Sequence, residues 1–193
     1  LIEELNKAKK NYSILSEEIG IIENSDKDNF WVIDPIDGTT NFLHGIPHFA
    51  ISIALKNKNE IISGLIYDPI KNEMFYAEKD NGAFLNNHRI RVSSKKNLNE
   101  CLFASGGKVE LNSKLNIRKS GCAALDLAYV ASGRYDGYFQ KDLNIWDIAA
   151  GLILVIEAGG KTNFKDNLNT NNLRVNAASN AIYEKMLENL DKF

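Results

Sequence analysis

The stretch that most constrains this chain is a hydrophobic strand that delivers two carboxylates, Asp34 and Asp37, onto a stiff turn. Residues Phe30–Ile33 have the apolar character of a buried strand, and Pro35 predicts the end of that strand. Paired carboxylates on a rigid turn suit a hard divalent cation, which prefers oxygen ligands. The stretch therefore predicts a metal site, although Asp, Pro, Gly and Thr are also ordinary turn residues.

The residues after this turn, Gly38, Thr39 and Thr40, offer backbone N–H groups and hydroxyls. Such groups suit the oxygens of a phosphate, because oriented N–H dipoles favour an anion. Together with the paired carboxylates they indicate a metal-assisted phosphatase site. The sequence contains no GxGxxG or P-loop pattern, so a nucleotide-cradling site of those kinds is unsupported.

Composition narrows the class of protein. The chain has 193 residues, 44% of them hydrophobic, and a formal net charge of -2, so it can bury a core and carries no excess charge. We therefore expect neither a nucleic-acid nor a membrane partner. No apolar run approaches the roughly 18 residues that a membrane span needs, and no signal peptide is evident. Two cysteines, Cys101 and Cys122, are too few for a disulfide scaffold, which fits a reducing cytoplasm.

Strand and helix patterns alternate irregularly, and residues 49–92 have the pattern of an antiparallel meander. This order favours an α+β or mixed α/β fold over a doubly wound parallel sheet. We expect one domain, 1–193, with a metal-binding half, 1–100, and a C-terminal α/β half, 101–193. The expected loops are 23–29 and 41–47; the expected strands are 12–15, 30–33, 49–55, 60–67, 73–78, 83–85, 89–92, 101–105, 137–139, 161–164 and 173–178; the expected helices are 1–11, 122–132, 148–158 and 181–193.

Further polar residues stand beside apolar elements. Glu17 follows a short apolar strand that can hold a carboxylate in place, although the adjacent pair Glu17 and Glu18 also suits a solvated surface. Asp147 stands where an apolar helix begins, a position at which a carboxylate is commonly an N-cap. His44 and His48 lie in a predicted loop and are candidates either for general bases or for ordinary hydrogen-bonding residues.

Two motifs in order, DPIDGTTNF at 34–42 and WDIAAG at 146–151, resemble the paired signature of the inositol monophosphatase family, part of the lithium-sensitive, magnesium-dependent phosphatase superfamily. SEE at 16–18, GCAALDLAYVASGRYDGY at 121–138 and EAGG at 157–160 extend the resemblance over nearly the whole chain. The resemblance implies a layered αβαβα sandwich of the inositol monophosphatase and fructose-1,6-bisphosphatase type. It implies hydrolysis of a phosphate monoester, first of all myo-inositol monophosphate. The alternatives are fructose 1,6-bisphosphate, histidinol phosphate or a 3′-phosphoadenosine nucleotide, or a catalytically weak binding or scaffold member.

The resemblance also implies a metal site with two or three Mg²⁺ ions, for which Mn²⁺ could substitute. Glu17, Asp34 and the backbone carbonyl of Ile36 would bind the first ion. Asp34, Asp37 and Asp147 would bind the second, and Glu17 would serve a weaker third. The implied two-metal chemistry is charge neutralisation, a nucleophile of lowered pKa, and alignment.

The implied catalytic residues are Thr39, Asp37 and Glu17. The backbone N–H groups of Gly38 and Thr39 would hold the phosphate, and the Thr39 hydroxyl would orient a metal-bound water for in-line attack. Asp37 would position a water that protonates the leaving group. The residues implied to contact the rest of the substrate are Gly121, Cys122, Ala123, Gln140 and Asp147.

Two departures from the family pattern carry expectations. The position of Gln140 is commonly Glu in the family, so this chain would contact the polyol with a neutral amide. The chain starts at Leu1 within a helical pattern, so we expect it to lack the family's N-terminal helix and hairpin, and with them part of the first layer. In the family that segment supplies an acid that pairs with the threonine matched by Thr39. The resemblance also implies a homodimer.

Overall fold

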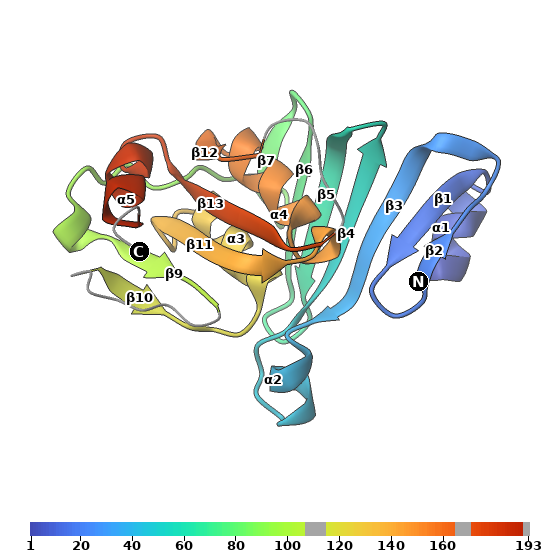
Figure 1. The fold of residues 1–193 in the computed structure, drawn as a ribbon, viewed down its shortest axis with the longest axis horizontal. Coiled ribbons are helices and arrows are strands. Elements are labelled where there is room, and N and C mark those ends of the chain that lie inside the picture. Colours follow the sequence, from blue (N-terminus) through green and yellow to red (C-terminus); the bar gives the residue numbers. More distant parts are fainter. Residues whose placement is uncertain (107–114, 165–170, 191–193) are drawn as a thin grey trace.

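The computed structural model describes residues 1–106, 115–164 and 171–190 (Figure 1). The elements follow one another as α1 (Ile2–Ala8), β1 (Tyr12–Ser16), β2 (Gly20–Ile22), β3 (Asp26–Asp37), α2 (Thr39–Leu43), β4 (Ala50–Asn57), β5 (Glu60–Asp68), β6 (Glu73–Glu78), β7 (Gly82–Leu85), β8 (His88–Arg89), a 3₁₀ turn (Leu98–Glu100), β9 (Leu102–Ala104), β10 (Asn116–Arg118), α3 (Ala123–Ala131), β11 (Gly137–Leu143), α4 (Ile145–Glu157), β12 (Gly160–Thr162), β13 (Leu173–Ser179) and α5 (Tyr183–Leu190).

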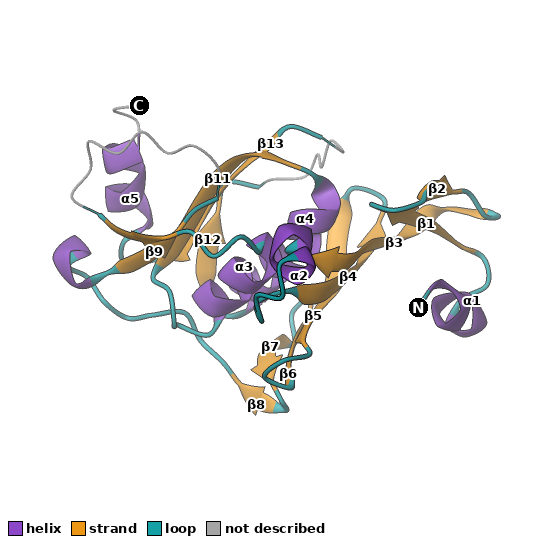
Figure 2. Cartoon of the chain, turned by 90° about the horizontal axis from the view of Figure 1, so that it is seen from below, coloured by secondary structure: helices purple, strands orange, loops and turns teal. Residues whose placement is uncertain are grey.

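Two sheets form the frame of the fold. The larger has the order β2-β1-β3-β4-β5-β6-β7-β8 and is antiparallel except for the parallel pair β1 and β3. The smaller is mixed and has the order β10-β9-β11-β13-β12. Helices α3 and α4 lie between the two sheets, and α5 packs beside the smaller one (Figure 2). The expected mixed α/β fold and the antiparallel meander are confirmed.

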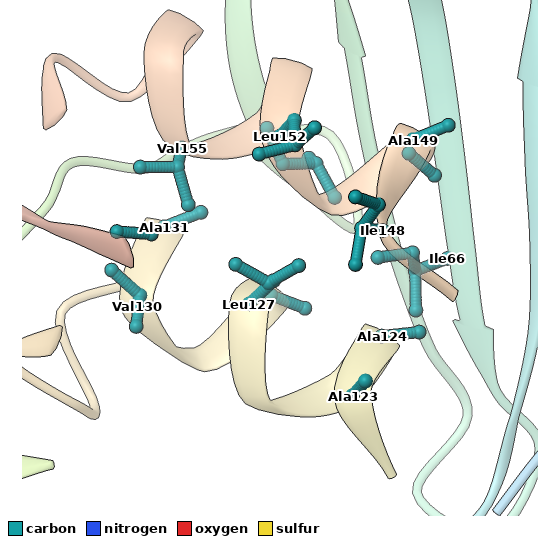
Figure 3. Close-up of a cluster of buried hydrophobic side chains, with 14 of the residues drawn as sticks. Ile66, Ala123, Ala124, Leu127, Val130, Ala131, Ile148, Ala149, Leu152 and Val155 are labelled. Atoms are coloured by element: carbon teal, nitrogen blue, oxygen red, sulfur yellow. The ribbon is translucent and has the colours of Figure 1, made fainter. Parts of the chain in front are cut away.

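Helix α3 shows why this middle layer is so apolar. Every residue from Ala123 to Ala131 is buried, because α4 and both sheets enclose the helix. Leu127 of α3 reaches toward Ile148 and Leu152 of α4 in the centre of the cluster (Figure 3). Side chains of this size, each buried fully, contribute about 1.5–3 kcal/mol apiece to the stability of the fold.

Helix α4 is fixed against the larger sheet along its length. A Cβ added to Gly64 of β5 would lie 2.7 Å from the Cα of Ala150, so glycine is needed for this close approach of strand and helix. At the other end of the helix, the Glu157 carboxylate accepts hydrogen bonds from the backbone N–H groups of Asp80 at 2.9 Å and Gly82 at 2.8 Å. These contacts fix the helix that carries Asp147 to the sheet that carries Asp34.

The structure corrects the expected ends of several elements near the site. Strand β3 does not end before Pro35 but continues through it to Asp37, with an irregularity between Asp34 and Asp37 in its pairing with β4. Proline lacks an N–H to donate, and a bulge is a place where a strand tolerates that loss. The strand also begins earlier than predicted, at Asp26, within the expected loop 23–29.

Other differences lie in short elements that carry a weak periodic signal. The expected loop 41–47 begins inside the short helix α2, and β2 and β10 were not predicted. The last strand of the meander, β8, is confined to His88–Arg89 instead of 89–92. The final helix was predicted over 181–193; α5 spans Tyr183–Leu190, and 191–193 lie outside the described residues. None of the helices described is long and apolar enough to cross a membrane.

Candidate metal and phosphate site

The parallel pairing of β1 with β3 brings two distant acids to one edge of the larger sheet. Ser16 at the end of β1 is paired with Ile33 of β3, and the next residue, Glu17, donates its backbone N–H to the Ile33 carbonyl at 3.2 Å. Because parallel strands end at the same edge, Glu17 and Asp34 emerge side by side. Asp147 reaches the same edge from the first turn of α4.

Glu17, Asp34 and Asp147 form a carboxylate cluster. One ligand oxygen from each of these residues lies within 4.8 Å of the other two. Asp34 is buried, Asp147 is half-buried and Glu17 is exposed, so the cluster opens from the core toward solvent. A set of donors made only of oxygen suits a hard cation such as Mg²⁺ or Mn²⁺. The three residues could hold a metal ion.

Asp37 lies at the same cavity but outside this cluster of three. Its Oδ2 accepts a hydrogen bond from the Cys122 thiol, with Sγ at 3.0 Å, and another from the backbone N–H of Ala124 at 2.5 Å. Both donors belong to the start of α3. All four predicted acids therefore line one cavity, and Oδ2 of Asp37 is hydrogen-bonded to the start of α3.

The pKa values of these carboxyls are raised chiefly by burial and, to a lesser extent, by their mutual repulsion. Burial, with added repulsion from Asp37 and Glu17, holds the pKa of Asp34 well above its usual range. Burial raises the pKa of Asp147 to about 6. Burial also raises the pKa of Asp37 to about 6, although the hydrogen bonds from Cys122 and Ala124 oppose that rise. A bound cation would relieve this repulsion, because it favours the ionised form of each carboxyl.

Asp147 takes part in the start of α4 in a different position from the one predicted. The N-cap residue is Asn144, and Asp147 stands three residues further, inside the first turn. The Asp147 Oδ2 accepts a hydrogen bond from the backbone N–H of Asn144 at 2.7 Å. The N-cap interpretation is therefore wrong by one turn, and the carboxylate is oriented by the helix start while it faces the cluster.

The turn after Asp37 carries backbone N–H groups and the Thr39 hydroxyl in place of carboxylates. Gly38 has a φ of 89° and precedes the short helix α2. A Cβ at this position would lie 3.1 Å from the His48 carbonyl oxygen, so both conformation and space favour glycine. The Thr39 hydroxyl donates a hydrogen bond to the Ile36 carbonyl at 3.0 Å, and the Ile36 N–H donates to Asp34 Oδ1 at 2.9 Å.

One cavity of about 330 Å³ joins these groups. Its lining residues are Glu17, Asp34, Asp37, Gly38, Thr39, Thr40, Gly106, Gly121, Cys122, Ala123, Asp126, Gln140, Asp142, Leu143 and Asp147. The lining includes every predicted site residue except Ile36, which is bonded to two residues of the lining. The carboxylate cluster, the Gly38–Thr39 turn and the start of α3 therefore face the same space.

The predicted polyol wall consists of the start of α3 and one residue of β11. The Gln140 Oε1 accepts a hydrogen bond from the hydroxyl of buried Tyr138 at 2.8 Å, which fixes the amide. A Cβ on Gly106 would lie 2.1 Å from that same Oε1, so the amide packs directly on the backbone of Gly106. The amide therefore has a defined place at the cavity.

Sequence reasoning missed two further acids of the lining, Asp126 and Asp142. Asp126 is 1% exposed, accepts a hydrogen bond from Ser120 Oγ at 2.7 Å, and has a pKa that burial raises to about 7. A lone carboxylate among the alanines and leucines of α3 was the available signal. Asp142 has a φ of 59° in the irregular part of β11, and no periodic pattern marks such a position.

The two candidate histidines lie outside the described cavity lining. The exposed His44 ring places Nδ1 2.9 Å from the Thr40 carbonyl oxygen. The His48 ring stacks edge-on against Tyr129 at 6.2 Å, and burial lowers its pKa. The His44 contact is of the hydrogen-bonding kind expected as the alternative to catalysis, whereas His48 packs against an aromatic ring.

Comparison with known proteins gives this cavity its context. The model of the inositol monophosphatase family matches residues 1–192. The chain belongs to the inositol monophosphatase family. An inositol-1-monophosphatase of Rhizobium meliloti is 47% identical over 173 residues, which cover 82% of this chain and 65% of that protein. The Nus factor SuhB of Haemophilus influenzae is 43% identical over 175 residues, which cover 83% of this chain and 66% of that protein.

The fold agrees with this family membership. The crystal structure of the extragenic suppressor protein suhB from Bartonella henselae superimposes with a TM-score of 0.92 at 41% sequence identity. The match covers 99% of this chain and 81% of that one. The mixed α/β fold is therefore that of the inositol monophosphatase family. The chain spans about two thirds of the length of the Rhizobium meliloti and Haemophilus influenzae relatives.

Proposed function

We propose that this protein is a Mg²⁺-dependent phosphatase that hydrolyses a phosphate monoester, with myo-inositol monophosphate as its substrate. The observation that carries the proposal is the meeting of an all-oxygen cluster, Glu17, Asp34 and Asp147, with the Gly38–Thr39 turn at one cavity. The cluster suits a cation, and the N–H groups and hydroxyl of the turn suit a phosphate. The name of the Rhizobium meliloti relative supports the same reaction.

Glu17, Asp34 and Asp147 would hold Mg²⁺, with the Ile36 carbonyl and the second oxygen of Asp37 as further ligands. The raised pKa values of Asp34 and Asp147 support this role: burial and, to a lesser extent, neighbouring carboxylates disfavour the ionised forms, and a bound cation would favour them. When bound, Mg²⁺ supplies positive charge that favours attack on phosphorus and lowers the pKa of a coordinated water. The site would hold two Mg²⁺ ions and a more weakly bound third ion at Glu17, and Mn²⁺ could replace Mg²⁺.

The chain's own groups would orient the reactants. Because the Thr39 hydroxyl donates its hydrogen bond to the Ile36 carbonyl, its oxygen is left as an acceptor for a water molecule. The backbone N–H groups of Gly38 and Thr39 would hold the phosphate beside that water. Asp37 would place a second water to return a proton to the departing alcohol.

The alcohol part of the substrate would face Gly121, Cys122, Ala123 and Gln140. The Gln140 amide, fixed by Tyr138, presents a neutral polar group that can hydrogen-bond a hydroxyl. The same cavity leaves three other substrates open: fructose 1,6-bisphosphate, histidinol phosphate and a 3′-phosphoadenosine nucleotide. A homodimer and the lack of a nucleic-acid partner stay predictions; a relative named Nus factor SuhB makes the second worth testing.

The test is phosphate release by the purified chain from myo-inositol 1-phosphate and from these three alternatives, with and without Mg²⁺. We expect release that requires Mg²⁺, is fastest with myo-inositol 1-phosphate and is inhibited by Li⁺. Faster phosphate release from one of the other three compounds would indicate that this compound is the substrate. A chain that binds Mg²⁺ yet releases phosphate from none of the four would favour the binding or scaffold alternative.

A further inference from the structure

The Cys122 thiol occupies a position that its predicted substrate contact does not explain. Cys122 precedes the first turn of α3, is 1% exposed, and directs Sγ to the Asp37 carboxylate, 3.0 Å from Oδ2 and 3.5 Å from the Asp37 carbonyl oxygen. With the Ala124 N–H, it gives that one carboxylate oxygen two donors. A thiol used in this way has no second proton to offer a substrate hydroxyl.

The surrounding chain keeps the thiol in this place. The Ser120 hydroxyl accepts a hydrogen bond from the Cys122 N–H at 3.3 Å and donates one to Asp126 at 2.7 Å. The Ser120 carbonyl accepts a further hydrogen bond from the Asn41 side chain at 2.9 Å. The turn before α3 is therefore bonded to α2 on one side and to α3 on the other.

A buried cysteine can also be an ordinary small core residue, and this chain contains one. Cys101 is likewise 1% exposed, and its thiol donates to the backbone carbonyl of Asn97 at 3.2 Å. A backbone carbonyl is already fixed by its chain, whereas a carboxylate can rotate about its side-chain bonds. The Cys122 thiol can therefore orient the Asp37 carboxylate, whereas the Cys101 thiol bonds a carbonyl that the backbone already fixes.

We propose that Cys122 is a positioning residue, which holds Oδ2 of Asp37 toward α3 so that Oδ1 alone faces the carboxylate cluster. The inference rests on the proposed function, because it assumes that the cluster with Asp37 holds the cation. The thiol would then bind Asp37, and the substrate would contact the backbone of the turn before α3 and the Gln140 amide. Groups that orient a metal ligand typically change metal affinity or activity by about 10- to 100-fold when removed.

The experiment is a calorimetric titration of the full chain with Mn²⁺, without substrate, for four proteins. They are the parent, Cys122→Ala, Cys122→Ser and, as a matched control, Cys101→Ala. We expect Cys122→Ala to weaken Mn²⁺ binding by about 10-fold. Cys122→Ser, which keeps a donor, should bind nearly as tightly as the parent, and Cys101→Ala should bind as the parent does.

Equal binding by Cys122→Ala and the parent would overturn the inference, as would equal weakening by Cys122→Ala and Cys122→Ser. If Cys122→Ala does not fold, the isosteric pair Cys122→Thr and Cys122→Val replaces it, with a donor in the first and none in the second. In turnover assays the loss should fall on kcat, whereas a thiol that contacts substrate would change KM. Because the titration needs no substrate, it decides the inference even if none of the phosphate esters is hydrolysed.

Discussion

The Asp147 carboxylate accepts a hydrogen bond from the backbone N–H of Asn144 at 2.7 Å while it shares a cluster with Glu17 and Asp34. Asp147→Asn keeps an oxygen that can accept this bond and removes the charge. We expect Mg²⁺-dependent turnover to fall by more than the roughly 10- to 100-fold that loss of an outer-shell partner costs, because a neutral amide is a poor ligand for Mg²⁺.

Metal-free thermal unfolding of Asp147→Asn is the control for its fold. The unfolding temperature should stay the same or rise, since burial raises the pKa of Asp147 to about 6 and the ionised form is therefore costly at neutral pH. Unchanged turnover would mean that Asp147 serves the start of α4 alone.

Glu17 and Glu18 provide a matched pair for the outer side of the cluster. Both are exposed, but of the two only Glu17 places an oxygen with Asp34 and Asp147. Glu17→Gln should weaken Mg²⁺ binding by about 10-fold or more in a calorimetric titration, and Glu18→Gln should leave it unchanged. Equal effects of the two substitutions would show that Glu17 acts through general surface charge.

Stabilisation by Mg²⁺ should depend on pH in a direction set by the raised pKa values. Asp37 and Asp147 have pKa values near 6 in the fold, above those of free carboxyls, so the metal-free protein loses stability as pH rises from about 4 to about 6. Mg²⁺ binds the ionised forms. The rise in unfolding temperature on adding Mg²⁺ should therefore be large at pH 8 and small at pH 5, and an equal rise at both would contradict the site.

Asp126 allows a similar test without metal. Burial raises its pKa to about 7, so its ionisation costs the fold stability as pH rises from about 4 to about 7. Asp126→Asn can still accept the Ser120 hydrogen bond and has no charge to bury. We expect this variant to be more stable than the parent at pH 8, by roughly 2 kcal/mol, and equally stable at pH 4 in chemical denaturation. A destabilised variant at pH 8 would show that the charge of Asp126 has a partner.

Much of the fold follows from the sequence because its signals are local. The strands of the meander are apolar runs between short turns, and α3 and α4 combine apolar helical patterns with clear ends. Gly133 stands just beyond α3 with a φ of 71°, a left-handed conformation in which glycine commonly ends a helix. Asp37 ends β3 and Asp147 lies in the first turn of α4, so motif and element boundary pointed to these two acids, whereas Asp34 lies inside β3 and was found from the motif.

The remaining features depend on contacts between distant segments. The parallel pairing of β1 with β3 places Glu17 beside Asp34, and no local sequence pattern predicts that these two strands pair. Asp37 turns toward Cys122, a residue far along the chain, so its orientation has no signature near Asp37 itself. Pro35 inside β3 is tolerated because the pairing with β4 is irregular there, which is a property of both strands together.

Helix α4 carries Asp147 at its start and is held to the larger sheet by Ala150 against Gly64 in its middle and by Glu157 at its end. A helix anchored in this way has no easy local opening, so its amides should exchange with solvent only through unfolding of the whole core. The metal site would then be lost in the same cooperative unfolding transition as the core. Partial denaturation would leave a mixture of intact and unfolded molecules, and no population with a loosened site.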